Sequence, residues 1–153
     1  GFIQMDFPNR MPSPVGEVPE ALLKGLSIKP KSILKNNQAY FAIYSNEDDV
    51  LSVIQDSEQL KSLAPYDVVV TAPGTQFDFV SRYFWPANGG IEDPVTGSIH
   101  TGLAPYWAKE FGRSKLTAYQ ASKRGGTLKC EVAGDRVLIS GQAVSYLEGY
   151  ITI

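Results

Sequence analysis

The stretch from residue 89 to residue 100, GGIEDPVTGSIH, holds the residues best suited to chemistry, because small and acidic residues lead directly into a predicted helix start. The backbone N–H groups of Thr96, Gly97 and Ser98 are expected to lie unpaired at the positive end of the helix dipole, where carboxylates and phosphates bind. Asp93 lies one short loop away, and Ser98 adds a hydroxyl. This pattern favours proton transfer beside a small carboxylic acid. Asp93 and Ser98 are the catalytic candidates, and Thr96 and Gly97 are candidates for substrate binding.

Each of these residues also has a purely structural interpretation. An Asp or Thr before a helix often serves only as its cap. Arg82 is a candidate fork for a substrate carboxylate, but an arginine on a strand more often forms a structural ion pair or is solvated. His100, the only histidine, follows one turn into the helix, either as a packed, hydrogen-bonded residue or as a pocket residue. Both stay in the set of substrate-binding candidates.

A long helix over residues 96–111 is predicted to position this stretch. Its apolar residues recur at helical spacing, and the stripe that they form is wide enough to be enclosed by a sheet. The stripe comprises Ile99, Leu103, Ala104, Trp107, Ala108 and Phe111. Pro105 removes a backbone donor and predicts a kink or a restart of the helix, in which it would be a first-turn residue. Gly112 is a suitable C-terminal cap.

Strands dominate the rest of the chain. They are predicted at residues 2–7, 31–36, 39–45, 49–55, 67–71, 76–85, 116–122, 127–132, 136–140 and 143–153, with short helices at 20–25 and from residue 57 to before Pro65. Residues 31–55 are interpreted as a meander, since the asparagines and aspartates between its strands are strong turn formers. This order predicts one α+β domain over residues 1–153, in which a curved, barrel-like sheet surrounds a central helix.

Composition excludes several classes of function. The 153 residues carry a formal net charge of -2, which gives no field to attract nucleic acid or an anionic membrane. No apolar run approaches the roughly 20 residues of a membrane span, and no leader pattern opens the chain, so a cytoplasmic location is expected. Cys130 and His100, each the only one of its kind, cannot form a zinc site. No metal or cofactor is expected, and Cys130 is interpreted as an inert apolar residue.

Several motifs together resemble the PhzF-like isomerases of phenazine biosynthesis, and specifically the second half of these proteins. The motifs are MDFP at residues 5–8, DFVSRYF at 78–84, EDPVTGSIH at 92–100, LAPYW at 103–107, QASKRGG at 120–126 and GDRV at 134–137. The resemblance covers nearly the whole chain, and the EDPVTGS motif is specific.

The resemblance implies the fold of diaminopimelate epimerase, in which two similar domains, each a barrel-like roll around a central helix, enclose the site between them. It implies that Asp93 and Ser98 are polar groups of this cleft and that Gly97 and Ser98 supply backbone donors to the substrate. Arg82 and His100 match less closely. The related epimerases and racemases carry a reactive cysteine where this chain has Ser98, which argues against a racemase with two thiols.

The principal acid/base of the family is a glutamate of the first half, and nothing in this chain resembles that half. Two interpretations follow. The chain is half of a cofactor-independent isomerase, incomplete or inactive alone, which binds a small carboxylate-bearing metabolite together with a complementary first-domain half. Alternatively, it is a non-catalytic ligand-binding or assembly domain. A homodimer that imitates the two-domain parent is also expected, with residues 143–153 pairing outside their own domain.

Overall fold

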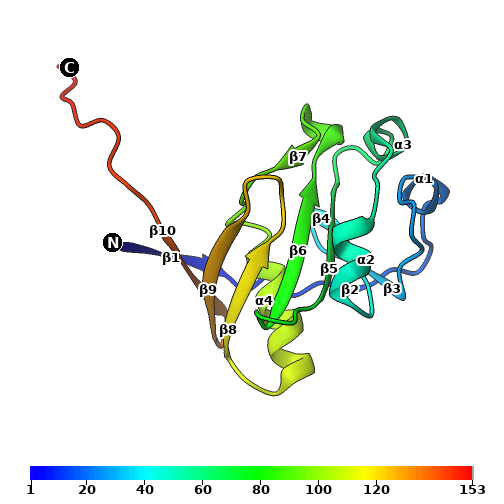
Figure 1. The fold of residues 1–153 in the computed structure, drawn as a ribbon, viewed down its shortest axis with the longest axis horizontal. Helices are drawn as coiled ribbons and strands as arrows, with labels where there is room; N and C mark the ends of the chain where they lie inside the picture. The colour runs from blue at the N-terminus through cyan, green and yellow to red at the C-terminus, as the bar shows by residue number, and fades with distance from the viewer. Residues whose placement is uncertain (153) are drawn as a thin grey trace.

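The computed structural model describes residues 1–152 and has an α+β fold dominated by one ten-stranded sheet (Figure 1). The strands are β1 (Phe2–Pro8), β2 (Ser13–Pro14), β3 (Ser32–Lys35), β4 (Ala39–Ile43), β5 (Asp67–Pro73), β6 (Phe79–Phe84), β7 (Glu92–Asp93), β8 (Lys115–Gln120), β9 (Gly126–Ala133) and β10 (Arg136–Gln142). The helices are α1 (Glu20–Lys24), α2 (Glu47–Ser52), α3 (Ser57–Lys61), the 3-10 helix η1 (Pro86–Asn88) and α4 (His100–Phe111). The α+β prediction is confirmed.

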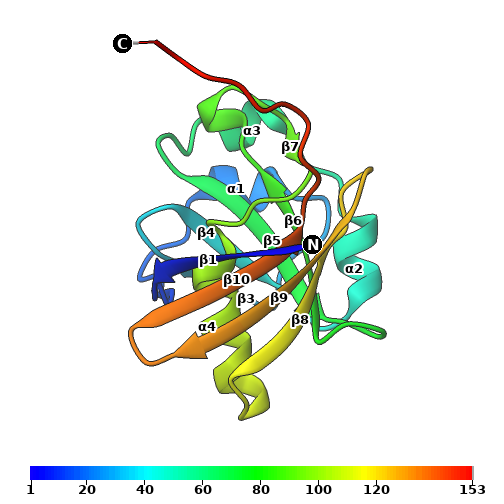
Figure 2. The ribbon, with the colours of Figure 1, turned by 90° about the vertical axis from the view of Figure 1, so that its left-hand side faces the viewer.

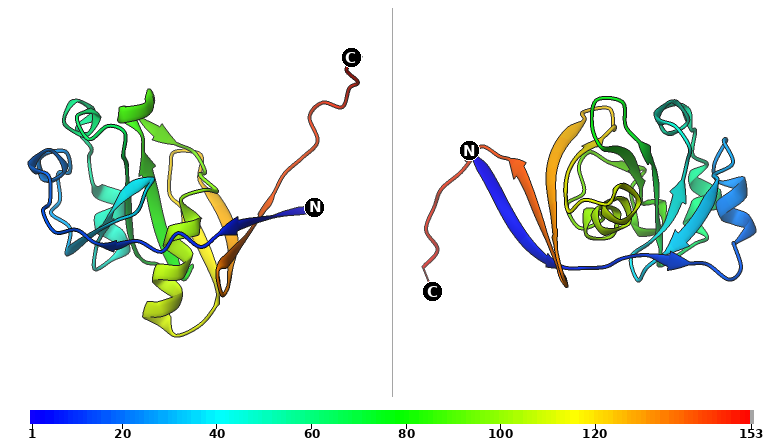
Figure 3. Two further views of the ribbon diagram at one scale, coloured as in Figure 1. Left: turned by 180° about the vertical axis from the view of Figure 1, so that it is seen from behind. Right: turned by 90° about the horizontal axis from the view of Figure 1, so that it is seen from below.

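The sheet curves around α4, which lies in its concave side (Figure 3). The strand order is β1-β10-β9-β8-β6-β5-β4-β3-β2, with β7 paired to β6. Leu103 and Trp107 of α4 are buried in a core with apolar residues of β4, β6, β8, β9 and β10. The predicted enclosure of the helix is therefore confirmed. Because the two ends of this strand order do not pair within residues 1–152, the sheet is an open roll rather than a closed barrel.

Helices α1, α2 and α3 lie on the other face of the sheet, over β3 to β6, and enclose a second apolar core (Figure 1). The strands β1, β10, β9 and β8 have no helix in front of their outer face (Figure 2). Strand β6 belongs to both cores, since Phe79 and Tyr83 face α4 whereas Val80 and Phe84 face the second core. This alternation decides on which side of the sheet each polar residue of β6 lies.

The strand predicted at residues 49–55 is wrong, because α2 (Glu47–Ser52) takes its place. Asn46 accepts a hydrogen bond from the backbone of Asp49 at 2.8 Å and so caps the helix. Glu47, Asp48 and Asp49 then lie in the first turn, where negative charge is favourable. The predicted meander is therefore wrong in its third strand, while its first two strands form the antiparallel pair β3–β4. The helical connection leads instead to β5, which is a parallel neighbour of β4.

The long helix begins at His100 and not at Thr96. Residues 97–99 form a tight turn instead, in which His100 N donates to Gly97 O at 3.1 Å. The prediction that Pro105 lies in the first turn of a helix is wrong, because Pro105 lies inside α4. The carbonyl four residues earlier, that of Thr101, accepts a hydrogen bond from Arg10 N at 3.0 Å. A loop outside the helix therefore supplies the donor that Pro105 lacks.

The strand predicted over residues 143–153 is also wrong within the described residues. Strand β10 ends at Gln142, and residues 143–152 leave the body of the domain as an extended segment without regular structure (Figure 1). Ile153 lies outside the described residues. Five large apolar side chains of this segment are almost fully exposed: Val144, Tyr146, Leu147, Tyr150 and Ile151. The apolar side chains that suggested a strand are therefore not buried by the described part of their own domain.

Candidate functional site

The predicted catalytic loop is held between the sheet and α4. Asp93 belongs to β7 and pairs with Tyr83 of β6, which fixes its backbone beside the sheet. The Thr96 hydroxyl donates to the carboxylate of Asp93. The Thr96 carbonyl also accepts a hydrogen bond from the ring Nδ1 of His100, at 2.8 Å. The structure therefore brings together Asp93, Thr96 and His100, three of the residues predicted from the sequence.

Gln120 at the end of β8 clamps this loop, and the sequence analysis missed it as a site residue. Its Oε1 accepts from Thr96 N at 2.8 Å, and its Nε2 donates to Asp93 O at 2.8 Å and to Thr96 Oγ1 at 3.2 Å. Its side chain is fully buried. Its position in the strand could have indicated this role. Leu116, Ala118 and Gln120 alternate along β8 on its buried face, and Gln120 is the polar residue among them.

Two backbone amides before α4 are free to bind an anion. The N–H groups of Gly97 and Ser98 have no hydrogen-bond partner within residues 1–152. The N–H of Thr96, which was also expected to be free, is taken by Gln120. Gly97 lines a groove of about 780 Å³ that reaches along β1, β9 and β10 and includes Met5, Gly126 and Val144. Gly97 thus places one of the two residues at an open groove near the positive end of α4.

His100 lies in the core rather than in the groove. Its side chain is fully buried, and its Nδ1 is 2.8 Å from the Thr96 carbonyl, which can only accept, so Nδ1 carries the proton. Burial lowers the pKa of His100 to about 4 despite this bond. Within the described residues, Nε2 has no partner. The geometry supports the packed, hydrogen-bonded interpretation, in which a neutral ring holds the loop from Asp93 to Ser98 on α4.

Arg82 is not brought to the loop. Its guanidinium lies on the face of the sheet opposite to α4 and forms a bidentate pair with Glu92, at 2.8 and 3.0 Å. Its remaining nitrogen donates to the carbonyl of Val53, the C-terminal cap of α2, at 2.8 Å. With these donors engaged, the structural ion-pair interpretation has the stronger support.

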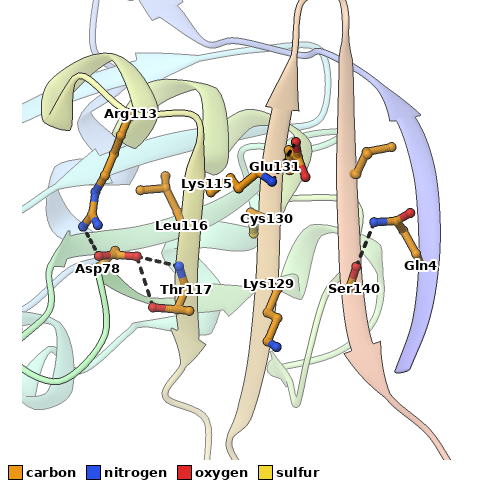
Figure 4. A pocket seen from close by; sticks show the side chains of 11 residues that line it. Gln4, Asp78, Arg113, Lys115, Leu116, Thr117, Lys129, Cys130, Glu131 and Ser140 are labelled. Carbon is orange, nitrogen blue, oxygen red and sulfur yellow. Dashed lines mark hydrogen bonds and ion pairs between the residues drawn. The ribbon is translucent and has the colours of Figure 1, made fainter. Parts of the chain in front are cut away.

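A second pocket, of about 490 Å³, lies on the outer face of β8, β9, β10 and β1 (Figure 4). Four of its charged groups are paired, Asp78 with Arg113 and Lys115 with Glu131, and Asp78 also accepts from Thr117 N at 2.6 Å. Burial raises the pKa of the Cys130 thiol to about 12, which keeps it protonated and unreactive. No cluster of three or more potential metal ligands occurs within residues 1–152.

The arrangement of the loop suits recognition of a small anion beside a carboxyl group. Gly97 and Ser98 offer adjacent N–H donors, the Ser98 hydroxyl adds a third polar group, and the same loop carries Asp93, whose carboxylate accepts from the Thr96 hydroxyl. Amides at a helix start stabilise negative charge that develops on a substrate oxygen, whereas a carboxyl group can move a proton. These are the parts that a proton transfer next to a carboxylate needs.

Comparison with known proteins places these features in a family. The model of the phenazine biosynthesis-like proteins, PhzC-PhzF, matches residues 1–149. An uncharacterized isomerase of Pseudomonas aeruginosa is 44% identical over 147 residues, which cover 96% of this chain and 56% of that protein. An uncharacterized isomerase of Halalkalibacterium halodurans is 37% identical over 154 residues, covering 99% of this chain and 58% of its own.

A solved structure agrees with these relatives. A PhzF-family phenazine biosynthesis protein of Enterococcus faecalis superimposes with a TM-score of 0.87 at 37% identity, over 95% of this chain and 58% of the other. The chain therefore spans little more than half the length of these relatives. No helix within residues 1–152 has the length and hydropathy that crossing a bilayer requires. The chain belongs to the PhzC-PhzF family of phenazine biosynthesis-like proteins.

Proposed function

We propose that this chain forms one half of a cofactor-independent PhzF-like isomerase and supplies one wall of a cleft for a small carboxylate-bearing metabolite. Asp93 and Ser98 take part in the proton transfer, and Gly97 holds the substrate. Thr96, whose N–H is taken by Gln120, acts by holding Asp93 in place. The observation that carries the proposal is the pair of free amides at Gly97 and Ser98, on the same loop as Asp93. Thr96 holds the carboxylate of Asp93, and Gln120 holds its backbone carbonyl. Arg82 and His100 act from a distance, by holding Glu92 and the loop.

The complete cleft needs a second half. A two-domain arrangement of the diaminopimelate epimerase type is supported by the roll of strands around α4 and by relatives of almost twice this length. In it, residues 1–153 form one domain, and the start of α4 faces the other. The half alone binds ligand weakly and does not isomerise it efficiently, since the family's principal acid/base belongs to the other half.

Binding of acetate tests the proposed site. In the free chain, the amide NMR signals of Gly97 and Ser98 are expected to shift with millimolar acetate, because their unpaired N–H groups lie just before α4, at its positive end. Affinity is expected to be weak, because Asp93 repels a second negative charge unless it is protonated or turned away. Acetamide, which is neutral and of the same shape, is the control. Unmoved Gly97 and Ser98 signals in acetate, or equal shifts in acetamide, would contradict the proposal.

A homodimer that substitutes for the second half is supported by exposed apolar surface. Phe2, Ile3 and Met5 on β1 are about half exposed, and Tyr146 and Tyr150 in the final segment are 99% exposed. Surfaces of this kind favour a partner. The same observation favours the alternative function, a non-catalytic assembly domain, which the acetate experiment distinguishes because such a domain has no need of an anion site.

Light scattering at micromolar concentration tests the homodimer. The expected mass is twice the 16.7 kDa of the chain. A variant in which Tyr146 and Tyr150 are both replaced by Ser is expected to dissociate, since it loses the two most exposed aromatic side chains. A matched variant, Tyr119→Ser, changes a tyrosine that stacks on Phe77 within the domain, away from the final segment. A chain that is monomeric at 16.7 kDa would exclude the homodimer and favour a separate complementary half.

A further inference from the structure

A chain of hydrogen bonds runs from the interior of the domain to the hydroxyl of Ser98. Gln38 Nε2 is 2.9 Å from Ser98 Oγ and 3.1 Å from Tyr83 OH. Tyr83 OH is 2.6 Å from Asp67 Oδ2, and Asn88 Nδ2 is 2.7 Å from Asp67 Oδ1. The five residues come from distant parts of the sequence: η1, β5, β6, the residue before β4, and the turn before α4. The sequence around Ser98 does not predict these hydrogen bonds.

Asp67 fixes the direction of each bond in the chain. The amide of Asn88 can only donate from its nitrogen, and an ionised carboxylate can only accept, so both oxygens of Asp67 act as acceptors. Tyr83 therefore gives its single hydroxyl proton to Asp67. Burial, and then this bond, raise the pKa of Tyr83 well above its ordinary value, so the phenol keeps its proton. The oxygen of Tyr83 is left to accept a hydrogen bond from Gln38.

The orientation of the Gln38 amide follows from Tyr83. If its oxygen and nitrogen were exchanged, Oε1 would face the phenol oxygen, whose only proton is committed to Asp67. The Oε1 atom is buried and has no partner within the described residues, whereas Nε2 in this orientation has an acceptor on each side. The two hydrogens of the Gln38 amide are thus directed at Tyr83 and at Ser98.

The orientation of the Gln38 amide determines how Ser98 can bind a ligand. Because Ser98 Oγ accepts a hydrogen bond from Gln38, its own hydroxyl proton is free to point elsewhere. We infer that Gln38 is a positioning residue: through Asp67 and Tyr83 it sets Ser98 as a hydrogen-bond donor toward a bound carboxylate. This inference deepens the proposed function and rests on it for the ligand. It assigns to Ser98 the role of a hydrogen-bond donor toward the ligand.

The direction of the bonds is testable without ligand. The two side-chain amide protons of Gln38 give separate NMR signals, and each is expected to report one acceptor. Tyr83→Phe is expected to shift one of these signals, and Ser98→Ala the other. Ser81→Ala is the matched control, since Ser81 lies on the same strand with a buried hydroxyl that has no partner within residues 1–152. If both variants shift the same proton, or neither shifts any, the orientation of Gln38 is wrong and the inference fails.

Acetate affinity tests the consequence at the site. Ser98→Ala is expected to weaken binding about tenfold, as loss of a hydrogen bond to a charged group does. Gln38→Met, which is similar in shape but donates no hydrogen bond, is expected to weaken binding about threefold when Ser98 is present, by loss of preorganisation. In the Ser98→Ala background, Gln38→Met is expected to have no effect, since no hydroxyl is left to position.

The outcomes separate the two proposals. If Gln38→Met weakens acetate binding equally with and without Ser98, Gln38 acts by another route and the inference is overturned while the site stands. If the wild-type chain does not bind acetate at Gly97 and Ser98, the proposed site fails, and the donor role of Ser98 toward a carboxylate fails with it. The ligand-free signals of Gln38 then decide whether the directed chain exists at all.

Discussion

Replacing Leu103 with Ala is expected to lower the free energy of unfolding by about 2–5 kcal/mol. Leu103 is fully buried on α4, where the sheet curves around it, and it packs in a core with residues of six strands, β4 to β6 and β8 to β10. Removing its side chain leaves a cavity that a closely enclosed helix cannot fill by shifting, because strands meet it on several sides (Figure 3). Urea denaturation followed by tryptophan fluorescence measures the change, since Trp107 lies in the same core.

Leu51→Ala supplies the matched control for this prediction. Leu51 is the same residue type in a helix, but it is 49% exposed on α2. Its truncation is expected to cost less than about 1 kcal/mol, as for most surface substitutions. A loss below about 0.5 kcal/mol for Leu103→Ala, or equal losses at the two positions, would show that α4 does not depend on enclosure by the sheet.

The parts of the fold that follow from local pattern were predictable. The stripe on α4 predicted a buried helix, and strands were predicted where β8 and β9 lie. Residues 46–49 were misinterpreted because Asn and Asp favour turns and helix starts alike, and only the bond from Asp49 N to Asn46 decides between them. The final segment was misinterpreted because an apolar pattern predicts a strand only if a neighbour is present to pair with it.

Only those residues of the candidate site that lie close together in the sequence could be predicted. Asp93, Thr96, Gly97 and Ser98 are adjacent in the chain, and their types indicated an anion site before the fold was known. Gln38 and Gln120 lie 60 and 24 residues from their partners in the loop, and no spacing rule connects them. Glutamines of this kind become visible only when the sheet brings their strands to the start of α4.

The stability of the protein is expected to fall by about 2 kcal/mol between pH 7 and pH 5 because of His100 alone. Burial lowers its pKa in the folded chain from 6.5 to about 4. As the pH falls through 6.5, the unfolded chain takes up a proton that the folded chain resists, so the unfolded state gains stability. The contribution is therefore fully present above pH 6.5 and is lost progressively down to about pH 4, where the folded chain also protonates.

The measurement is the free energy of unfolding from urea titrations at several pH values between 7 and 5. His100→Asn is the comparison, because its amide can still donate to the Thr96 carbonyl but does not titrate. Since the chain has a single histidine, the difference between the two pH profiles isolates this residue from the carboxylates. The wild-type profile is expected to be steeper by about 2 kcal/mol over this range. Parallel profiles would mean that His100 is reached by water in the folded chain, and that the loop from Asp93 to Ser98 is not held by a neutral, buried ring.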